Sequence, residues 1–227
     1  MEEKKSIRKN YIYNLSYQII VLIVPFITTP YISRVLGPNG VGISSYTNSI
    51  VSYFLILAVL GTTDYGQREI AYLQDDLYER TSKFLEIVII RTITGITSLL
   101  LFIIVTWNSE LQKIYMIQAV NLLAVILDIS WFFQGIEEFG KTTVRNIAVK
   151  ILTIVIIFTF VKEESDLPIY IASISVSTCV GNASLWINIK KYLQKVNIKE
   201  IHPFANIKGI VQLFIPTIAI QVAAVLD

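Results

Sequence analysis

Long apolar runs recur along the chain, and short stretches rich in charged residues separate them. Each run has about 20 residues, the length that an α-helix needs to cross a bilayer core of about 30 Å. This pattern predicts an all-α polytopic membrane protein, a six-helix transmembrane bundle followed by the start of a seventh helix. The expected spans are residues 12–35, 42–62, 84–106, 112–134, 146–161 and 168–189, and then 209–227.

The composition agrees with a membrane location. Of the 227 residues, 54% are hydrophobic and 16% are charged, and the mean hydropathy is +0.61. These values lie outside the usual range of soluble domains. The apolar run after residues 1–10 is too long for the core of a signal peptide. We therefore expect residues 1–10 to form a cytoplasmic tail, with no cleaved leader.

Basic residues gather in alternate loops. Fifteen of the 19 Lys and Arg residues flank spans on one side of the predicted bundle, against three on the other. Because cytoplasmic loops carry an excess of Lys and Arg, we predict a multi-pass plasma-membrane protein with a cytoplasmic N-terminus. Such an asymmetric distribution is no sign of nucleic-acid binding. The fifteen residues are Lys4, Lys5, Arg8, Lys9, Arg68, Arg80, Lys83, Lys141, Arg145, Lys150, Lys190, Lys191, Lys195, Lys199 and Lys208.

The distribution of charge also divides the chain into segments. Residues 11–189 are expected to form a first transmembrane lobe, and the lysine-rich residues 190–208 a cytoplasmic linker. Residues 209–227 are expected to be the incomplete start of a second lobe. Residues 213–218, with Pro216, echo residues 22–27, with Pro25, as a parallel repeat of six-span units would.

Polar side chains align along one face of five of the six predicted spans. Because the bilayer core holds no water, such faces must meet protein or a hydrated cavity. Two interpretations remain open: the faces line a substrate cavity, or their hydrogen bonds, worth about 0.6–2 kcal/mol each, hold the helices together. Span 146–161 lacks such a face and is expected to contact lipid. The cavity candidates are Asn14, Gln18, Asn48, Arg91, Asn121 and Asp128.

Two of these candidates are charged and lie at similar depth. At 1.5 Å per residue, Arg91 is about 10 Å, and Asp128 roughly 8 Å, from the cytoplasmic ends of their antiparallel spans. An unpaired charge at such depth costs several kcal/mol, so we predict that the two face each other or share one wet cavity. A structural ion pair and a substrate or ion contact are equally compatible with this spacing.

The first span contains Pro25 and Pro30. Each proline removes a backbone donor and pushes the helix off straight, which a membrane tolerates where neighbouring helices or water satisfy the freed carbonyls. We therefore treat both prolines as candidate kinks in a moving helix.

Little in the sequence suggests catalysis or metal binding. Cys179 is the one cysteine and His202 the one histidine, so we expect no zinc cluster, no internal disulfide and no cofactor. The predicted outer loops, such as residues 37–41 and 162–167, are too short for the extracellular active site of a glycan polymerase or ligase. We expect a protein that is not an enzyme.

Several motifs resemble those of a known transporter family. They are PYISRVLGP at residues 30–38, LG at 60–61, YGQREIA at 65–71, WFFQGIE at 131–137, RN at 145–146 and FIP at 214–216. In this order the chain resembles the polysaccharide biosynthesis (Wzx-type) flippases of the multidrug/oligosaccharidyl-lipid/polysaccharide exporter superfamily. The Trp-Phe-Phe-Gln-Gly run is the most specific of the matches.

The resemblance implies two six-helix lobes around a central cavity that opens alternately to the two membrane faces. Its implied cargo is an undecaprenyl-pyrophosphate-linked oligosaccharide, flipped across the plasma membrane for capsule or O-antigen assembly. The expected partners are this lipid-linked oligosaccharide, membrane lipids, a second lobe and other polysaccharide assembly proteins.

The resemblance also leaves alternatives open. Members of the family are about twice this length, so we expect a truncated product, a fragment or half of a split transporter. A drug or ion antiporter of the same superfamily is the nearest rival, and a non-transporting membrane partner protein is another. Span 12–35 has no acidic residue, which weakly favours an anionic or sugar cargo over a cation.

Overall fold

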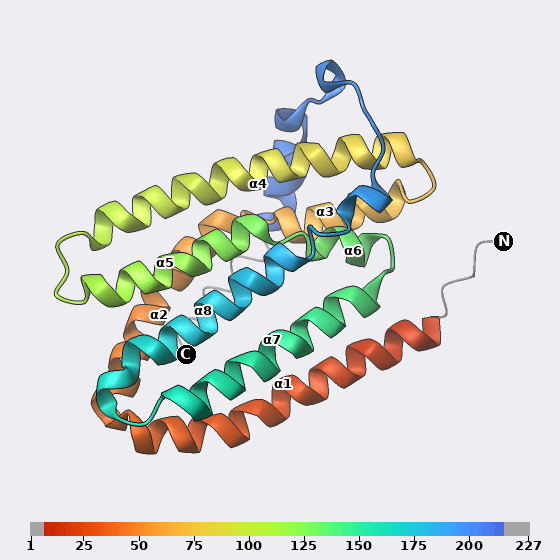
Figure 1. The fold of residues 1–227 in the computed structure, drawn as a ribbon. Helices are drawn as coiled ribbons and strands as arrows, with labels where there is room; N and C mark the ends of the chain where they lie inside the picture. The colour runs from red at the N-terminus through yellow and green to blue at the C-terminus, as the bar shows by residue number, and fades with distance from the viewer. Residues whose placement is uncertain (1–6, 216–227) are drawn as a thin grey trace.

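The structure is a computed structural model that describes residues 7–215, with side chains placed for residue 15 and from residue 18 onward (Figure 1). Residues 7–215 form helices and contain no strand. The α-helices are α1 (Ile7–Val35), α2 (Gly37–Val59), α3 (Thr62–Tyr72), α4 (Leu77–Thr106), α5 (Gln112–Leu127), α6 (Ser130–Gly135), α7 (Phe139–Phe160) and α8 (Leu167–Ser184). Short 3₁₀ turns follow, η2 (Ile189–Tyr192), η3 (Ile198–Glu200) and η4 (Pro203–Asn206), after η1 (Glu164–Asp166) before α8.

The all-helical fold is confirmed in the described residues, but the count of six spans is not. Five helical segments there are long and apolar enough to cross a membrane. In the place expected for the sixth span, α8 has 18 residues, and Ser173, Ser175, Ser177 and Asn182 lower its apolar character. Residues 207–215 begin a further helix, and the rest of the expected seventh span lies outside the described residues.

Two of the spans are broken helices. The segment Gly37–Tyr72 divides into α2 and α3 at Leu60 and Gly61, whose φ angles are 45° and 73°. The segment Gln112–Gly135 divides into α5 and α6 at Asp128 and Ile129. The apolar pattern predicted one span over residues 112–134 and did not predict the break at Asp128, whereas the predicted span 42–62 ends close to the break at Leu60 and Gly61.

The bundle has a packed centre and a loose edge. α5 packs against α2, α4 and α8, whereas α1 and α7 lie side by side along one edge (Figure 1). Each candidate span contains an apolar stretch of 18 residues, and these stretches differ in burial. The buried share is 44% in Gln112–Gly135, but only 11% in Phe139–Phe160 and 6% in Gln18–Val35. The peripheral position agrees with the expectation for α7. Gln18 of α1 is exposed on the surface of this bundle, and its role as a cavity residue stays a prediction.

α3 packs into the charged end of the bundle. Gly66 of α3 lies against the indole of Trp131 in α6, so closely that a Cβ would come within 2.5 Å of Trp131 Cε3. Ile70 is completely buried in the same cluster, together with Phe132 and Phe133. This helix lies between the predicted spans 42–62 and 84–106, and the structure shows that it packs inward.

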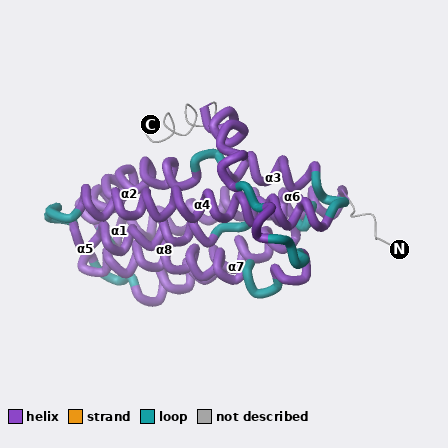
Figure 2. Tube along the Cα trace, turned by 90° about the horizontal axis from the view of Figure 1, so that it is seen from above, coloured by secondary structure: helices purple, strands orange, loops and turns teal. Residues whose placement is uncertain are grey.

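The basic loops share one end of the bundle. The start of α1, the α3–α4 turn, the α6–α7 turn and the segment after α8 lie together, opposite the other three connections (Figure 1). Seen from above, the helix that starts at residue 207 projects from the side of the bundle on which α3 lies (Figure 2). The arrangement agrees with the charge asymmetry, and the cytoplasmic assignment of this end remains a prediction.

The contact of Gly66 with Trp131 gives a stability test. We expect Gly66→Ala to destabilise the fold by about 1–3 kcal/mol, because the added methyl group overpacks a closed interface. Thermal unfolding of the purified protein in detergent measures the effect. Gly42→Ala is the matched control, since open space surrounds Gly42 in α2; equal melting temperatures for both variants would contradict the packing assignment.

Candidate functional site

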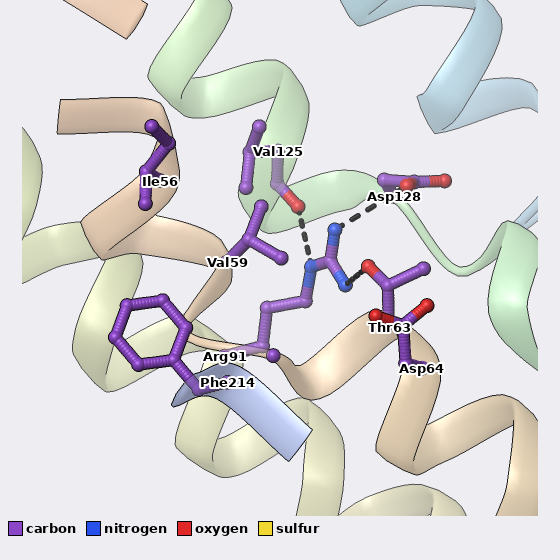
Figure 3. A pocket seen from close by; sticks show the side chains of 9 residues that line it. Ile56, Val59, Thr63, Asp64, Arg91, Val125, Asp128 and Phe214 are labelled. Carbon is purple, nitrogen blue, oxygen red and sulfur yellow. Dashed lines mark hydrogen bonds and ion pairs between the residues drawn. The ribbon is translucent and has the colours of Figure 1, made fainter. Parts of the chain in front are cut away.

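Arg91 lies in the interior of the bundle, between the two helix breaks. Its residue is 2% exposed, and each guanidinium nitrogen has a partner (Figure 3). Nε donates to the carbonyl oxygen of Val125 at 2.8 Å. Nη1 donates to Thr63 Oγ1 at 3.0 Å and, at 3.4 Å, to Thr62 Oγ1. Nη2 lies 3.3 Å from Asp128 Oδ2.

The contact confirms the predicted pairing of Arg91 with Asp128. Asp128 also accepts from the backbone N–H of Ser130 at 3.0 Å through Oδ1, at the start of α6. A second guanidinium, that of Arg145 in α7, lies 3.8 Å from the same oxygen. Two guanidinium groups and one carboxylate therefore meet where α5 is broken.

The break in α5 leaves carbonyl oxygens that need donors, because the last four carbonyls of a helix have no partner within it. Side chains from three other elements supply them. Asn182 Nδ2 in α8 donates to Ala124 O at 2.6 Å, Arg91 to Val125 O, and Trp186 Nε1 to Leu127 O at 2.7 Å. Arg145 Nη1 in turn donates to Asn182 Oδ1 at 2.6 Å.

Side chains also donate to the carbonyls that are freed at the break in α2. Thr62 Oγ1 donates to the carbonyl of Val59 at 2.5 Å, and Thr94 Oγ1 of α4 donates to that of Ala58 at 2.8 Å. Gly61 has a φ of 73° and also allows a close approach, since a Cβ there would lie 3.1 Å from Ile210 O and from Phe214 Cβ. The helix that begins at residue 207 therefore packs directly on this break.

A cavity of about 240 Å³ lies beside Arg91 (Figure 3). The ring of Phe214 contributes to one wall, so the helix after the linker helps to enclose it. The remaining lining residues come from α2, α3, α4, α5 and the two breaks. They are Ile56, Val59, Gly61, Thr63, Asp64, Arg91, Val125 and Asp128.

The structure brings together only some of the predicted cavity residues. Arg91 and Asp128 line the cavity. Asn121 is half-buried and donates to Gln118 Oε1 at 3.0 Å, while Gln118 donates to Thr47 of α2 at 3.2 Å. This chain of hydrogen bonds joins α5 to α2, as the interpretation of polar residues as helix-packing contacts requires.

The other predicted residues lie on the surface of the bundle or are not described. Gln18 and Asn48 are exposed, and the side chain of Asn14 lies outside the described residues. Pro25 and Pro30 are exposed within α1, which continues through both of them. Their role as kinks stays a prediction, as do the substrate roles of all six polar candidates.

Asn48 belongs to a polar stripe on α2. Ser45, Asn48 and Ser52 share one helical face with Ile56 and Val59 of the cavity, by their spacing of three or four residues. Asn48 and Val59 are eleven residues apart, so this face runs about 17 Å from exposed Asn48, past half-buried Ser52 and buried Ile56, to the cavity. The stripe and the cavity thus form one continuous face.

Sequence reasoning missed two polar contributors to the site. Arg145 was assigned to a loop, because the apolar run that predicts its span begins at residue 146, but α7 starts at Phe139. Asn182 was recognised only as part of a polar stripe. In the sequence, Arg145 and Asn182 are recognisable only as hydrogen-bonding residues next to apolar ones. That pattern does not predict that both would contact a helix break.

The sequence profile of the family described as "Polysaccharide biosynthesis protein" matches residues 7–227. The chain belongs to this family. The resemblance stated from the motifs is thereby confirmed. Within the fold, the most specific of these motifs supplies core residues: Trp131, Phe132 and Phe133 are all buried.

One similar protein is the "Putative O-antigen transporter" of Escherichia coli (strain K12). The two sequences are 28% identical over 172 residues, which make up 73% of this chain and 41% of that protein. The matched region therefore covers less than half the length of this relative. No solved structure matches the chain.

The Arg91–Asp128 pair gives a second stability test. Asp128→Asn removes a negative charge beside a guanidinium that is almost completely buried, so we expect a loss of about 3 kcal/mol of stability. Arg91→Met leaves Asp128 with Arg145, and the double variant Arg91→Met/Asp128→Asn should be more stable than Asp128→Asn alone. Thermal unfolding in detergent measures all three.

The exposed Glu110 provides the control for that experiment. Glu110→Gln removes a carboxylate outside the bundle and should leave the melting temperature unchanged. A double variant that is as unstable as the sum of its single variants would contradict an energetic coupling between Arg91 and Asp128.

Proposed function

We propose that the chain forms the first bundle of a carrier that moves a lipid-linked oligosaccharide across the plasma membrane by alternating access, for capsule or O-antigen assembly. Membership of the polysaccharide biosynthesis family supports a role in polysaccharide transport. The name of the Escherichia coli relative supports the transport of an O-antigen precursor in particular.

The observation that carries this proposal is the polar face of α2 that leads to a cavity with a buried ion pair. Exposed Ser45 and Asn48 would be costly against lipid, because hydrocarbon offers them no hydrogen-bond partners. In the proposed carrier this face borders the translocation path. Amide and hydroxyl groups suit sugar hydroxyls, which both donate and accept hydrogen bonds.

The chemistry of the proposed cargo requires such a path. A pyrophosphate-sugar headgroup cannot enter hydrocarbon without losing its hydration, whereas the apolar polyprenyl tail is stable among the lipid tails. A polar face at the edge of the bundle lets the headgroup move along protein while the tail remains in the bilayer. The helix that begins at residue 207 would carry the second bundle, placed opposite this face by its contact with Gly61.

Arg91 acts in this proposal as a positioning residue. Its donors are engaged with Val125, Asp128 and the threonines of α3, so it holds the two breaks in register beside the path. In this proposal, the exposed residues Ser45 and Asn48 of α2 contact the cargo directly.

The test is complementation of a strain that lacks its own flippase. Asn48→Leu should reduce surface polysaccharide about tenfold, because one sugar hydrogen bond worth about 1.4 kcal/mol is lost during translocation. Lipid-linked oligosaccharide should accumulate, and membrane abundance should stay at the wild-type level.

The matched control is Thr97→Leu, the same change of a polar residue to leucine at an exposed position of α4. It lies outside the proposed path and should leave export unchanged. Wild-type export by Asn48→Leu, or an equal defect in both variants at equal abundance, would contradict the assignment of the α2 face to the path.

A cation antiporter is a second candidate, favoured by one observation. Two carboxylates, Asp64 and Asp128, line the cavity, and acidic side chains are the usual partners of protons and cations in transporters. If this candidate is right, Asp64→Asn abolishes cation or drug efflux from loaded vesicles, and expression of the gene fails to restore polysaccharide export.

A further inference from the structure

The segment after α8 is held against the first turns of α4. Tyr78 OH donates to Glu200 Oε2 at 2.6 Å and accepts from the backbone N–H of Asn197 at 3.2 Å. Glu200 Oε1 also accepts from Asn197 Nδ2 at 2.8 Å. The hydrogen bonds from the Tyr78 hydroxyl and then from the Asn197 side chain lower the pKa of the Glu200 carboxyl. The backbone N–H of Gln194 also donates to Thr81 Oγ1 at 3.2 Å. The linker therefore has a defined position on the bundle.

Tyr78 places the linker over an apolar face of α4. Eleven residues, three turns, separate Tyr78 from Ile89, so both lie on the same side of the helix. From there an exposed stripe runs along the helix: Ile89, Ile93, Ile96, Leu100 and Ile104. A membrane helix with such a stripe presents it to the lipid tails.

The depth of Tyr78 corresponds to the headgroup layer. α4 has 30 residues and is therefore about 45 Å long, about 15 Å longer than a bilayer core. Its first turns, where the linker is attached, carry Glu79, Arg80 and Lys83, so we expect this end of α4 to extend beyond the core on the basic side. Figure 1 shows the linker crossing this end of α4 and projecting beyond the bundle.

The exposed linker side chains have the chemistry of a membrane interface. Ile198 is 82% exposed and Phe204 67%, although both are large apolar residues. Residues 190–208 contain five lysines and one carboxylate, that of Glu200, which Tyr78 and Asn197 hold against α4. The lysines are all exposed: Lys190, Lys191, Lys195, Lys199 and Lys208.

We propose that residues 190–208 form an interfacial anchor, which inserts Ile198 among the lipids beside α4 and binds anionic phospholipid headgroups through Lys195 and Lys199. Apolar side chains flanked by lysines bind such surfaces by combining burial with charge attraction. The anchor does not depend on the proposed cargo or on transport.

A buried network explains how the anchor would bear on the rest of the chain. Asn206 is 2% exposed; it accepts from Tyr65 OH at 2.7 Å and from Lys83 Nζ at 2.8 Å, and donates to Glu86 at 2.9 Å. The linker is thus fixed at Gln194 and again at Asn206. Headgroup binding between these points would brace the connection to the helix that begins at residue 207.

Fluorescence quenching in nanodiscs tests the anchor. Ile198→Cys, in the full-length protein with Cys179→Ala, carries an environment-sensitive fluorophore, and a nitroxide on a lipid headgroup serves as quencher. We expect strong quenching in membranes that contain phosphatidylglycerol and weaker quenching in pure phosphatidylcholine. Each lysine should strengthen docking about fivefold, so Lys195→Gln/Lys199→Gln should lower the ratio of docked to undocked anchor about thirtyfold.

Lys113→Gln is the control, because Lys113 is an exposed lysine in the first turn of α5. α5 begins at the end of the bundle opposite the linker (Figure 1). This substitution should leave the quenching unchanged. Three results would overturn the proposal: no quenching in either membrane, which would place Ile198 in water or under a second bundle; equal quenching in both membranes; or no effect of removing the two lysines. The quenching experiment does not measure polysaccharide export. A failure of the chain to restore export would therefore contradict the proposed function and not the proposed anchor.

Discussion

Backbone carbonyls inside a membrane have no water to bind, and this constraint organises the interior of the bundle. α2 and α5 both end inside the bundle, at Val59 and Leu127. Side chains from α3, α4, α8 and the segment after α8 donate to the carbonyls that are freed. The Arg91 guanidinium donates hydrogen bonds to the Val125 carbonyl, to threonine hydroxyls of α3 and to the Asp128 carboxylate. The two breaks therefore stabilise a buried arginine, and the arginine joins the two breaks.

The same breaks create the cavity. Where α2 turns away at Gly61 and α5 stops at Asp128, helices no longer pack along their full length, and a space of about 240 Å³ remains beside Arg91. Phe214 partly closes it. Because the exposed stripe of Asn48 leads to this point, the site that supports a carrier role lies at the margin of the first bundle.

Sequence reasoning predicted the elements better than their contacts. Helices in the places of the first six spans, the pairing of Arg91 with Asp128 and the peripheral position of α7 all follow from apolar runs, charge depth and the absence of polar residues. The positions of Gln18 and Asn48 on the surface of this bundle did not follow from the sequence, because a polar helix face indicates that a hydrogen-bonding partner is needed but does not identify it. Arg145 was missed because a charged residue at a span end is normally solvated.

The sequence by itself determined that the chain is a helical membrane protein with one basic end, because bilayer thickness and charge asymmetry act on runs of residues. The motifs also identified its family. Only the tertiary structure decided where α2 and α5 break, which donors cap them, and that Trp131 packs on Gly66. These features depend on which helices pack against each other. Side chains of neighbouring helices donate to the carbonyls at the helix ends, and the local sequence does not specify those neighbours.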